Sequence, residues 1–507
     1  MSSIAQSVPT TALPDSYVEQ RSRRWLPLGV IAAAHLMAVL DITVMFVALP
    51  SAQHALGMSV GARQWVLSAY TLAFASLLLL GGRLADRFGA RRTLIVGVVG
   101  FAVASAVGGA SLDGAMLIAA RAVQGAFGAA LVSSTKSLLV TVYTDEHERA
   151  RAMSIFGATL TTGMALGLIL GGVLTSGFGW RWCLYVNLAV CLAVVPSAVR
   201  VLPQLPPRPT VRMDPLSALL CSLGTVALVY GLGEATSAGW GSAAVIGSLA
   251  GSVAALAAFT ARQAGHVNGL LPLRVVRGRN RGGALIAMIF NGLSTVGLML
   301  ILTYQLQTVL HYSPLRTGLT LIPFAFAAAC GSMLIARRLI TRVAPRWPVS
   351  AGIVLSAAGL LPLLGLTASS HCMPLIVLAE LIEGVGTGLA GPAILAIALR
   401  AVAREDTGAA SAASSAAGQL GSSIGTALLN TIAATATAAY ITTHTTIGAA
   451  TATVHGYVVA AGWGGGILLV VAIPIAWLIN AGAPRRKPAS APGNLASAQA
   501  QVAGAGR

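Results

Sequence analysis

Ionisable side chains stand inside several apolar stretches of this sequence. Asp41 lies in HLMAVLDITVMFVALP, residues 35 to 50, and further examples are Arg121, Glu380 and Glu383. A charge near the centre of a membrane span costs about 2.5 to 3.5 kcal/mol on insertion scales, so it requires a partner, a water-filled cavity or a function. Asp41 is therefore predicted to bind and release protons. Two plainer alternatives are open: Arg121 as a structural cation on a backbone carbonyl, and both glutamates hydrated near the surface.

Helical spacing groups further polar residues with these charges. Gln124 lies three positions after Arg121. Glu380, Glu383 and Thr387 follow the same spacing of three and seven positions. Each set therefore projects from one side of its helix. At about 1.5 Å per residue, both sets fall in the outer half of a membrane, and we predict that these polar side chains line one substrate cavity beside the proton-binding aspartate.

Composition indicates that membrane helices position these residues. Of the 507 residues, 56% are hydrophobic and only 9% are charged, which is far from the composition of a soluble globular protein. Apolar stretches of about 20 residues can each cross a hydrocarbon core of about 30 Å. Fourteen spans are predicted, beginning near Trp25, Trp65, Leu94, Ala115, Ala152, Trp182, Pro215, Ser242, Arg281, Pro314, Trp347, Met373, Gly408 and Val458. The predicted fold class is an all-α polytopic membrane protein.

The distribution of basic residues predicts the orientation. With the N-terminus inside, alternation leaves only Arg63, Arg181 and Arg316 outside, as the positive-inside rule requires. The net charge of +18 therefore reflects topology, and no nucleic-acid partner is expected. Arg greatly outnumbers Lys, and Ala and Gly are abundant, as in proteins of GC-rich bacteria. The predicted location is the bacterial inner (cytoplasmic) membrane, with both termini in the cytoplasm.

Motifs for nucleotide and metal chemistry are missing from the sequence. A P-loop requires GxxxxGK[ST], and neither lysine, Lys136 or Lys487, follows a glycine. The zinc motif HExxH does not occur, and the five cysteines form no CxxC pair. We therefore expect no enzyme activity, no cofactor, no metal and no bound nucleotide, and an ion gradient as the energy source.

The segment GGRLADRFGARRTL, after the second span, carries a family signature. A simple interpretation is a charged cytoplasmic loop. The segment also resembles the signature GxLADRxGRR between spans two and three of the major facilitator superfamily, with Ala90 in place of one basic residue. The resemblance implies that five residues control the conformational change: Gly82, Asp86, Arg87, Gly89 and Arg91.

Other motifs resemble those of the fourteen-span drug:proton antiporters in that superfamily, the EmrB/QacA-like branch. LDITVMFVALP at 40 to 50 is similar to their first-span motif, and RAVQGAFGAA from Arg121 to their fourth-span motif. GMALGLILGG at 163 to 172 is similar to their antiporter motif, with Leu168 where the family has proline. The glycines of this motif permit close helix packing and are Gly163, Gly167, Gly171 and Gly172.

The resemblance also implies two pseudosymmetric six-helix bundles plus two extra central helices. The implied parts are a cytoplasmic tail (1–24), a bundle (25–202), a linker with two extra transmembrane helices (203–280), a second bundle (281–480) and a disordered cytoplasmic tail (481–507). ELIEGVGTG at 380 to 388 overlays RAVQGAFGA at 121 to 129, as expected for parallel repeats. Glu380 is then equivalent to Arg121, and Glu383 to Gln124.

These features predict a transporter that exports a lipophilic drug or antibiotic in exchange for external protons. Asp41 and Arg121 are the predicted proton-coupling residues. One proton entering across 100 mV supplies about 2.3 kcal/mol, enough for roughly a fiftyfold gradient of a neutral solute. The expected partners are the drug, protons and the lipid bilayer, and the expected state is a monomer.

Two alternative functions are open. One is a proton-coupled or facilitative transporter of a nutrient or metabolite, which the antiporter motif disfavours. The other is a membrane sensor without transport, which is disfavoured because the sequence contains no soluble domain.

Overall fold

The computed structural model describes residues 15–143, 145–204, 214–265, 278–340, 342–368, 372–400, 402, 407–444 and 448–480. Every regular element in these ranges is helical. The expected disordered tail from residue 481 lies outside the described residues, as do residues 1–14 of the expected N-terminal tail. The all-α prediction is therefore confirmed for the part of the chain that the structure describes.

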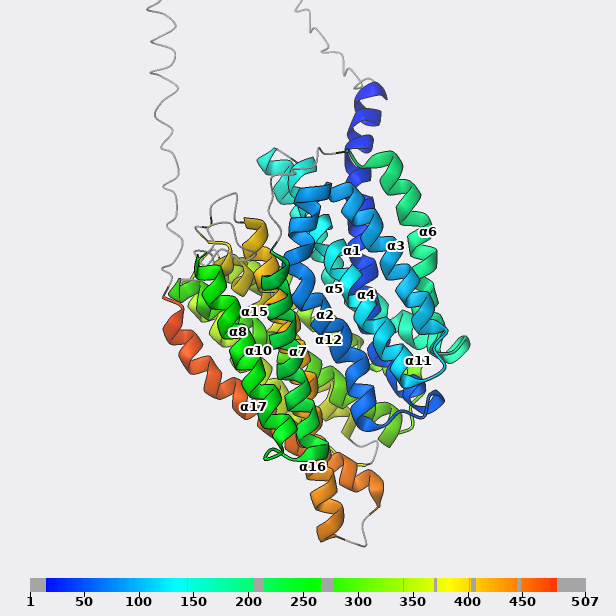
Figure 1. The fold of residues 1–507 in the computed structure, drawn as a ribbon, viewed down its shortest axis with the longest axis vertical. Coiled ribbons are helices and arrows are strands. Elements are labelled where there is room, and N and C mark those ends of the chain that lie inside the picture. The colour runs from blue at the N-terminus through cyan, green and yellow to red at the C-terminus, as the bar shows by residue number, and fades with distance from the viewer. Residues whose placement is uncertain are drawn as a thin grey trace, which may run out of the picture.

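The helices fall into two sets that lie beside each other, with the first set in blue to cyan in Figure 1. The first half contains α1 (Asp15–Ala55), α2 (Val60–Phe88), α3 (Ala90–Gly109), α4 (Gly114–Val142), α5 (Glu146–Gly177) and α6 (Trp182–Val201). Two central helices follow, α7 (Pro215–Ala238) and α8 (Ala243–Gly265). The second half contains α10 (Arg279–Tyr304), η1 (Gln305–Val309), α11 (Pro314–Thr320), α12 (Ile322–Cys330), η2 (Gly331–Ala336), α13 (Arg337–Ile340), α14 (Arg346–Leu360), η3 (Leu361–Gly365), α15 (Met373–Ala398), α16 (Thr407–Thr443) and α17 (Ala449–Leu478).

Several helices begin at side chains that cap them. Ser59, Asp113 and Asp214 each accept a hydrogen bond from the backbone N–H three residues further on, at 3.2, 2.8 and 3.1 Å. These bonds satisfy donors that the first turns of α2, α4 and α7 leave free. Short polar connections with capping residues therefore separate long apolar helices, as the spacing of the predicted spans requires.

Twelve helical segments among the described residues are long and apolar enough to cross a membrane. The two parts of α2, bent by 52° between Leu78 and Leu80, raise this count to thirteen if they form one span. The part of α5 from Thr162 to Gly177 is apolar but shorter. The polytopic class is confirmed, whereas this count gives twelve or thirteen spans and not the fourteen predicted.

Some predicted boundaries differ from the observed ones. α1 begins at Asp15, inside the expected tail, although its apolar span begins at Trp25 as predicted. α17 begins at Ala449, nine residues before the predicted start at Val458. Hydropathy marks the apolar window that fits the bilayer, whereas the backbone hydrogen bonds of a helix continue through flanking polar residues.

The start of α1 and the end of α17 lie at the same end of the molecule, which we call the terminal end (Figure 1). The connections α1–α2 and α16–α17 lie at the opposite end, which we call the hairpin end. Within the first half, α1 packs on α5, α2 on α4, and α3 on α4 and α6. The two halves meet where α2 packs on α16 and where α5 packs on α11 and α12.

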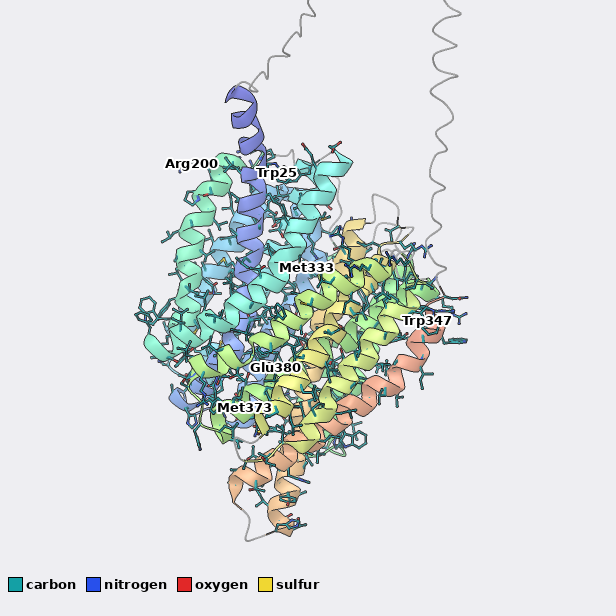
Figure 2. The ribbon with its side chains drawn as sticks, turned by 180° about the vertical axis from the view of Figure 1, so that it is seen from behind. Trp25, Arg200, Met333, Trp347, Met373 and Glu380 are labelled. Carbon is teal, nitrogen blue, oxygen red and sulfur yellow. The ribbon has the colours of Figure 1, made fainter. Side chains whose placement is uncertain are left out.

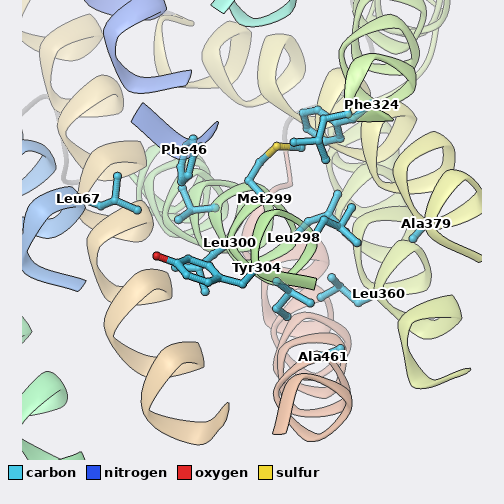
Figure 3. Close-up of a cluster of buried hydrophobic side chains, with 14 of the residues drawn as sticks. Phe46, Leu67, Leu298, Met299, Leu300, Tyr304, Phe324, Leu360, Ala379 and Ala461 are labelled. Atoms are coloured by element: carbon cyan, nitrogen blue, oxygen red, sulfur yellow. The ribbon is translucent and has the colours of Figure 1, made fainter. Parts of the chain in front are cut away.

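The apolar core joins the two halves mainly near the hairpin end. One cluster combines most of the second half with a few parts of the first, including Val44–Leu49 of α1 and Val66 and Leu67 of α2. Figure 3 shows Phe46 and Leu67 in this cluster with Leu300 and Tyr304 of α10. The second cluster, toward the terminal end, consists of first-half residues apart from alanines of α16. The halves are therefore held together by apolar packing chiefly at the hairpin end.

Candidate functional site

Asp41 lies within α1 and is held by side chains from two other helices of the first half. Its Oδ2 accepts a hydrogen bond from Arg121 Nη1 at 2.5 Å. Its Oδ1 accepts from Gln124 Nε2 at 2.7 Å and from Asn187 Nδ2 at 2.9 Å. Asp41 is 2% exposed and Arg121 is 1% exposed. A buried charge is tolerated when it is paired and hydrogen-bonded, and this network compensates the charge of Asp41 in both ways.

The guanidinium group of Arg121 makes several contacts besides the ion pair. Its Nη1 also donates to Gln124 Oε1 at 2.7 Å, and its Nε donates to the carbonyl oxygen of Val66 at 3.3 Å. The carbon of the guanidinium lies 4.3 Å from the ring centroid of Tyr70. The structure therefore contains both arrangements considered from the sequence, a backbone-bound cation and a partner for Asp41.

Two residues of this network were not predicted. Asn187 on α6 binds Asp41, and Ser105 on α3 accepts from Gln124 Nε2 at 2.6 Å and from Asn187 Nδ2 at 3.1 Å. Asn187 ends the stretch WRWCLYVN, residues 180 to 187, which also resembles the drug:proton antiporter branch and was the available signal, whereas no pattern in the sequence marks Ser105. Four helices, α1, α3, α4 and α6, thus supply the side chains that hydrogen-bond in this network, α2 adds the contacts of Val66 and Tyr70 to Arg121, and the first half positions this site by itself.

Glu380 and Glu383 lie on α15 in the second half, and both are 0% exposed. Figure 2 shows Glu380 farther along α15 than Met373, at which the helix begins. Ser294 Oγ on α10 donates to Glu383 Oε1 at 2.8 Å. Among the described residues, no hydrogen-bond partner is found for either carboxyl oxygen of Glu380 or for Oε2 of Glu383. The alternative of two glutamates hydrated at the surface is therefore wrong for this conformation.

Thr387 extends this second group of polar residues. Its Oγ1 donates to Asn291 Oδ1 at 3.0 Å and lies 3.0 Å from Thr295 Oγ1, both on α10. No hydrogen bond among the described residues joins this group to the network of Asp41. The residues expected around one cavity thus form two networks in this conformation, one in each half.

The predicted gating segment lies where α2 ends and α3 begins. Gly89 joins the two helices with φ of 93°, a conformation that side chains other than glycine rarely adopt. Asp86 and Arg87 are in the last turn of α2, and an added Cβ at Gly82 would meet nothing within 4 Å. Arg91 donates to the carbonyl oxygen of Val199 near the end of α6. The segment therefore links three helices of the first half.

The antiporter-motif glycines place α5 in close contact with α1 and α11. An added Cβ at Gly163 would lie 2.8 Å from Val39 Cγ1, and one at Gly171 would lie 3.0 Å from the carbonyl oxygen of Val44. Gly167 likewise faces Thr43 of α1. Gly172 faces the other half, where an added Cβ would lie 2.7 Å from Leu315 Cα of α11. α5 is an uninterrupted helix through Leu168, which replaces the family proline.

A cluster of polar residues near the hairpin end joins the two halves, and the sequence did not predict it. Arg63, 8% exposed, donates from Nη2 to Asn430 Oδ1 at 2.8 Å. Asn430 Nδ2 donates to Gln64 Oε1 at 3.0 Å. The Arg63 guanidinium lies 3.8 Å from the ring centroid of Tyr304, whose hydroxyl donates to Gln53 Oε1 at 3.2 Å. We call these five residues the polar seal. The signal available in the sequence was that Arg63 is one of only three arginines predicted to lie on the external side of the membrane.

Known proteins resemble this chain over most of its length. The sequence matches the profile of the Major Facilitator Superfamily over residues 31–426, with a second match over 284–504. The puromycin resistance protein pur8 of Streptomyces alboniger is 44% identical over 468 residues, which cover 90% of this chain and 91% of that protein. The tetracenomycin C resistance and export protein of Streptomyces glaucescens is 32% identical, with 82% of this chain and 77% of that protein covered.

Solved structures share the arrangement of helices. The POT family transporter PepTSo has a TM-score of 0.66 at 14% identity, covering 89% of this chain and 97% of that one. A bacterial homolog of the human lysosomal transporter Spinster, inward-facing and unoccupied, has a TM-score of 0.61 at 16% identity, covering 90% and 97%. At these identities the likeness concerns the fold alone. Together with the sequence match, it establishes that the chain belongs to the major facilitator superfamily.

Proposed function

We propose that this protein exports an antibiotic or another lipophilic drug from the bacterial cytoplasm in exchange for external protons. The buried ion pair between Asp41 and Arg121 carries the proposal, because a cation beside a buried carboxylate stabilises its charged form, so that a proton and the cation can replace each other on it. The relatives named for antibiotic resistance and export favour a drug over a nutrient, and favour transport over sensing.

In this mechanism, a proton and Arg121 compete for the carboxylate of Asp41. Protonation from outside neutralises Asp41 and releases Arg121, whose remaining acceptors are Gln124 and the carbonyl of Val66. Return of Arg121 to Asp41 expels the proton, so one proton leaves for each pair that forms again. The ion pair of the present conformation corresponds to the state after proton release.

The substrate path is proposed to run between the two polar networks. Gln124 would face the substrate from the first half, and Glu380, Glu383 and Thr387 would face it from the second. These side chains are packed against their own helices here, so a substrate reaches them only when the halves move apart. Carboxylates on one side of such a path favour cationic, lipophilic compounds.

The proposed topology has fourteen spans with both termini in the cytoplasm, as in the fourteen-span drug:proton antiporter branch. It adds α2 and α5 to the twelve apolar segments, because both are long helices that pack within the first half. The terminal end would be cytoplasmic, which requires an even number of spans. The parts would be bundles at 25–202 and 281–480 with α7 and α8 between them, in a monomer of the cytoplasmic membrane.

Drug uptake into everted membrane vesicles tests the proposed function. An exporter should accumulate a radiolabelled antibiotic such as puromycin inside these vesicles when the interior is acidified, and a protonophore should abolish accumulation. Equilibration without accumulation would indicate a facilitator, and the absence of specific uptake across a panel of drugs would indicate a protein that does not transport them. Either result would refute the proposal.

Arg63→Gln should open the hairpin end. The substitution removes a charged hydrogen bond and a cation–π contact that hold α2 to the second half, and a charged hydrogen bond contributes about 1.5 to 3 kcal/mol. We expect a membrane-impermeant maleimide to label Val47→Cys, a buried position whose backbone carbonyl accepts a hydrogen bond from Gln307 of the second half, at least about tenfold faster. Arg181→Gln is the matched control, since Arg181 bonds Ser111 within the first half. Equal labelling in both variants would show that Arg63 does not hold the end closed.

Asp86→Asn should slow the conformational cycle without weakening substrate binding. The carboxylate lies among the basic residues at the end of α2, and removing its charge changes the balance between the two states. A coupling of about 1 kcal/mol corresponds to roughly a fivefold loss of turnover. Transport kinetics in proteoliposomes would measure it, with Asp86→Glu as the charge-preserving control. A large rise in KM at unchanged turnover would contradict the gating role.

A further inference from the structure

The buried carboxyl groups of the two halves have different surroundings. Asp41 has a cation at 2.5 Å and two further donors. Glu380 occupies the position in the second repeat that Arg121 occupies in the first. It has no cation among the described residues, and the backbone N–H of Phe324 lies nearby but makes no hydrogen bond of normal geometry with it. Glu383, one turn away, has a single donor, Ser294. Burial of both glutamates is complete.

The helices packed around these glutamates supply no compensating charge. α10 presents Ser294, and α14 presents Gly359, on which Glu383 packs directly. In the described parts of α10, α12, α14, α16, η2 and η3, the charged residues are Arg279, Arg281 and Arg346. These arginines begin α10 and α14, so Arg281 and Arg346 each lie thirteen residues, about 20 Å, from Ser294 and Gly359. They are too distant to pair with either glutamate.

An ionised Glu380 or Glu383 would have a high free energy in these surroundings. Taking an unpaired charge out of water costs several kcal/mol even after relaxation, and two like charges one helical turn apart repel each other as well. The neutral, protonated form is the one that this packing accommodates. Asp41, by contrast, is arranged as a charged partner of Arg121.

Polar groups continue from this pair toward the terminal end. Ser294 contacts Glu383, and Thr387 contacts Thr295 and Asn291 one turn further along α15. Glu380 and Thr387 are seven residues apart, so the line of carboxyl, hydroxyl and amide groups extends about 10 Å along the interface of α10 and α15. Such groups accept and donate hydrogen bonds and give a proton on the glutamates a route that apolar packing would not.

We propose that Glu380 and Glu383 form a second proton-binding site, in the second half of the protein, which is loaded when the hairpin end is closed. Each loaded group is a carboxylic acid that releases one proton to the cytoplasmic side and becomes a carboxylate when the halves move apart at the terminal end and water or a cationic substrate reaches it. This inference rests on the proposed proton-driven export. It adds at least one proton per cycle to the one exchanged at Asp41, so that export of a monovalent cation moves net charge.

Infrared difference spectroscopy on the purified full-length protein tests the site without any transport. The carbonyl stretch of protonated carboxylic acids should be present at neutral pH, and should lose intensity in Glu380→Gln and in Glu383→Gln. Asp41→Asn serves as the control in which this intensity persists. If the wild-type protein shows no such band at neutral pH, or if both glutamine variants retain it in full, the glutamates are ionised there and the proposal fails.

The number of protons per exported drug tests the role of the site in the cycle. In proteoliposomes, the membrane potential that balances a known drug gradient gives this ratio, and we expect it to fall by about one in Glu380→Gln or Glu383→Gln. An unchanged ratio in both variants, or a loss of cationic but not neutral substrates at an unchanged ratio, would overturn the proposal. If the infrared band is present but no wild-type export responds to protons, the proposed function fails and the buried protonated pair stands.

Discussion

Asp41→Asn is expected to abolish proton-driven export while the drug still binds. Asparagine keeps the volume of the side chain but has no proton to exchange and no negative charge for Arg121. The roughly fiftyfold accumulation that one proton can drive across 100 mV should therefore disappear, leaving at most equilibration. Uptake into everted vesicles with and without a proton gradient measures the loss, and calorimetry of the purified variant measures drug binding.

Two further variants separate lost coupling from lost folding. Asp113→Asn is a matched control, because this aspartate caps α4 outside the apolar span and asparagine caps equally well. Asp41→Asn leaves Arg121 buried without its counter-ion, and breaking one side of a buried ion pair costs about 3 to 5 kcal/mol. Adding Arg121→Gln should restore thermal stability but not transport. If Asp41→Asn alone accumulated the drug at the wild-type rate, Asp41 would not be the coupling residue.

The sequence predicted the centre of this site because the cost of a buried charge and the helical period are local properties. Asp41 and Arg121 were each identified by their apolar surroundings, and Gln124 by its spacing from Arg121. The structure joins these three by hydrogen bonds. Ser105 is more than sixty residues from Asp41, and nothing in the local pattern around it differs from a packing serine.

Helical spacing alone could not show whether the predicted polar residues line one cavity. The period of a helix shows which residues share a face, but not which neighbouring helix that face meets. Glu383 and Thr387 do share a face of α15, and this face packs on α10 of the same half. The polar seal was missed for a related reason, because Arg63 and Asn430 are 367 positions apart in the sequence and the pattern of neither helix indicates the other as its neighbour.

Hydropathy predicted where the apolar spans lie, but not how the backbone changes within them. The apolar span of α1 begins at Trp25 as predicted, since tryptophan there opens a long and mainly apolar stretch. The span of α10 continues into a π-helical turn, and the segment after Pro314 is divided into α11, α12, η2 and α13. Such changes in backbone pattern depend on packing against neighbours, which hydropathy does not contain.

Gly172→Val is expected to prevent closure of the hairpin end and to stop the cycle in an outward-open state. An added Cβ at Gly172 would lie 2.7 Å from Leu315 Cα and 3.0 Å from the carbonyl oxygen of Pro314, and neither backbone atom can move aside without moving α11. Overpacking of this kind costs about 1 to 3 kcal/mol, which shifts the equilibrium roughly fivefold to a hundredfold toward the state in which α5 and α11 are apart. Faster maleimide labelling of Val47→Cys and a matching fall in export would measure it.

The neighbouring glycine shows why this effect should be conformational. Gly171 faces the carbonyl of Val44 on α1, within the same half, so Gly171→Val should lower thermal stability in every state of the cycle. Gly172 faces the opposite half, so its valine variant should keep its stability and lose only the closed state. Gly177→Val, where an added Cβ meets nothing within 4 Å, is the control at the end of the same helix. Wild-type labelling and export in Gly172→Val would mean that α5 and α11 need not come together during transport.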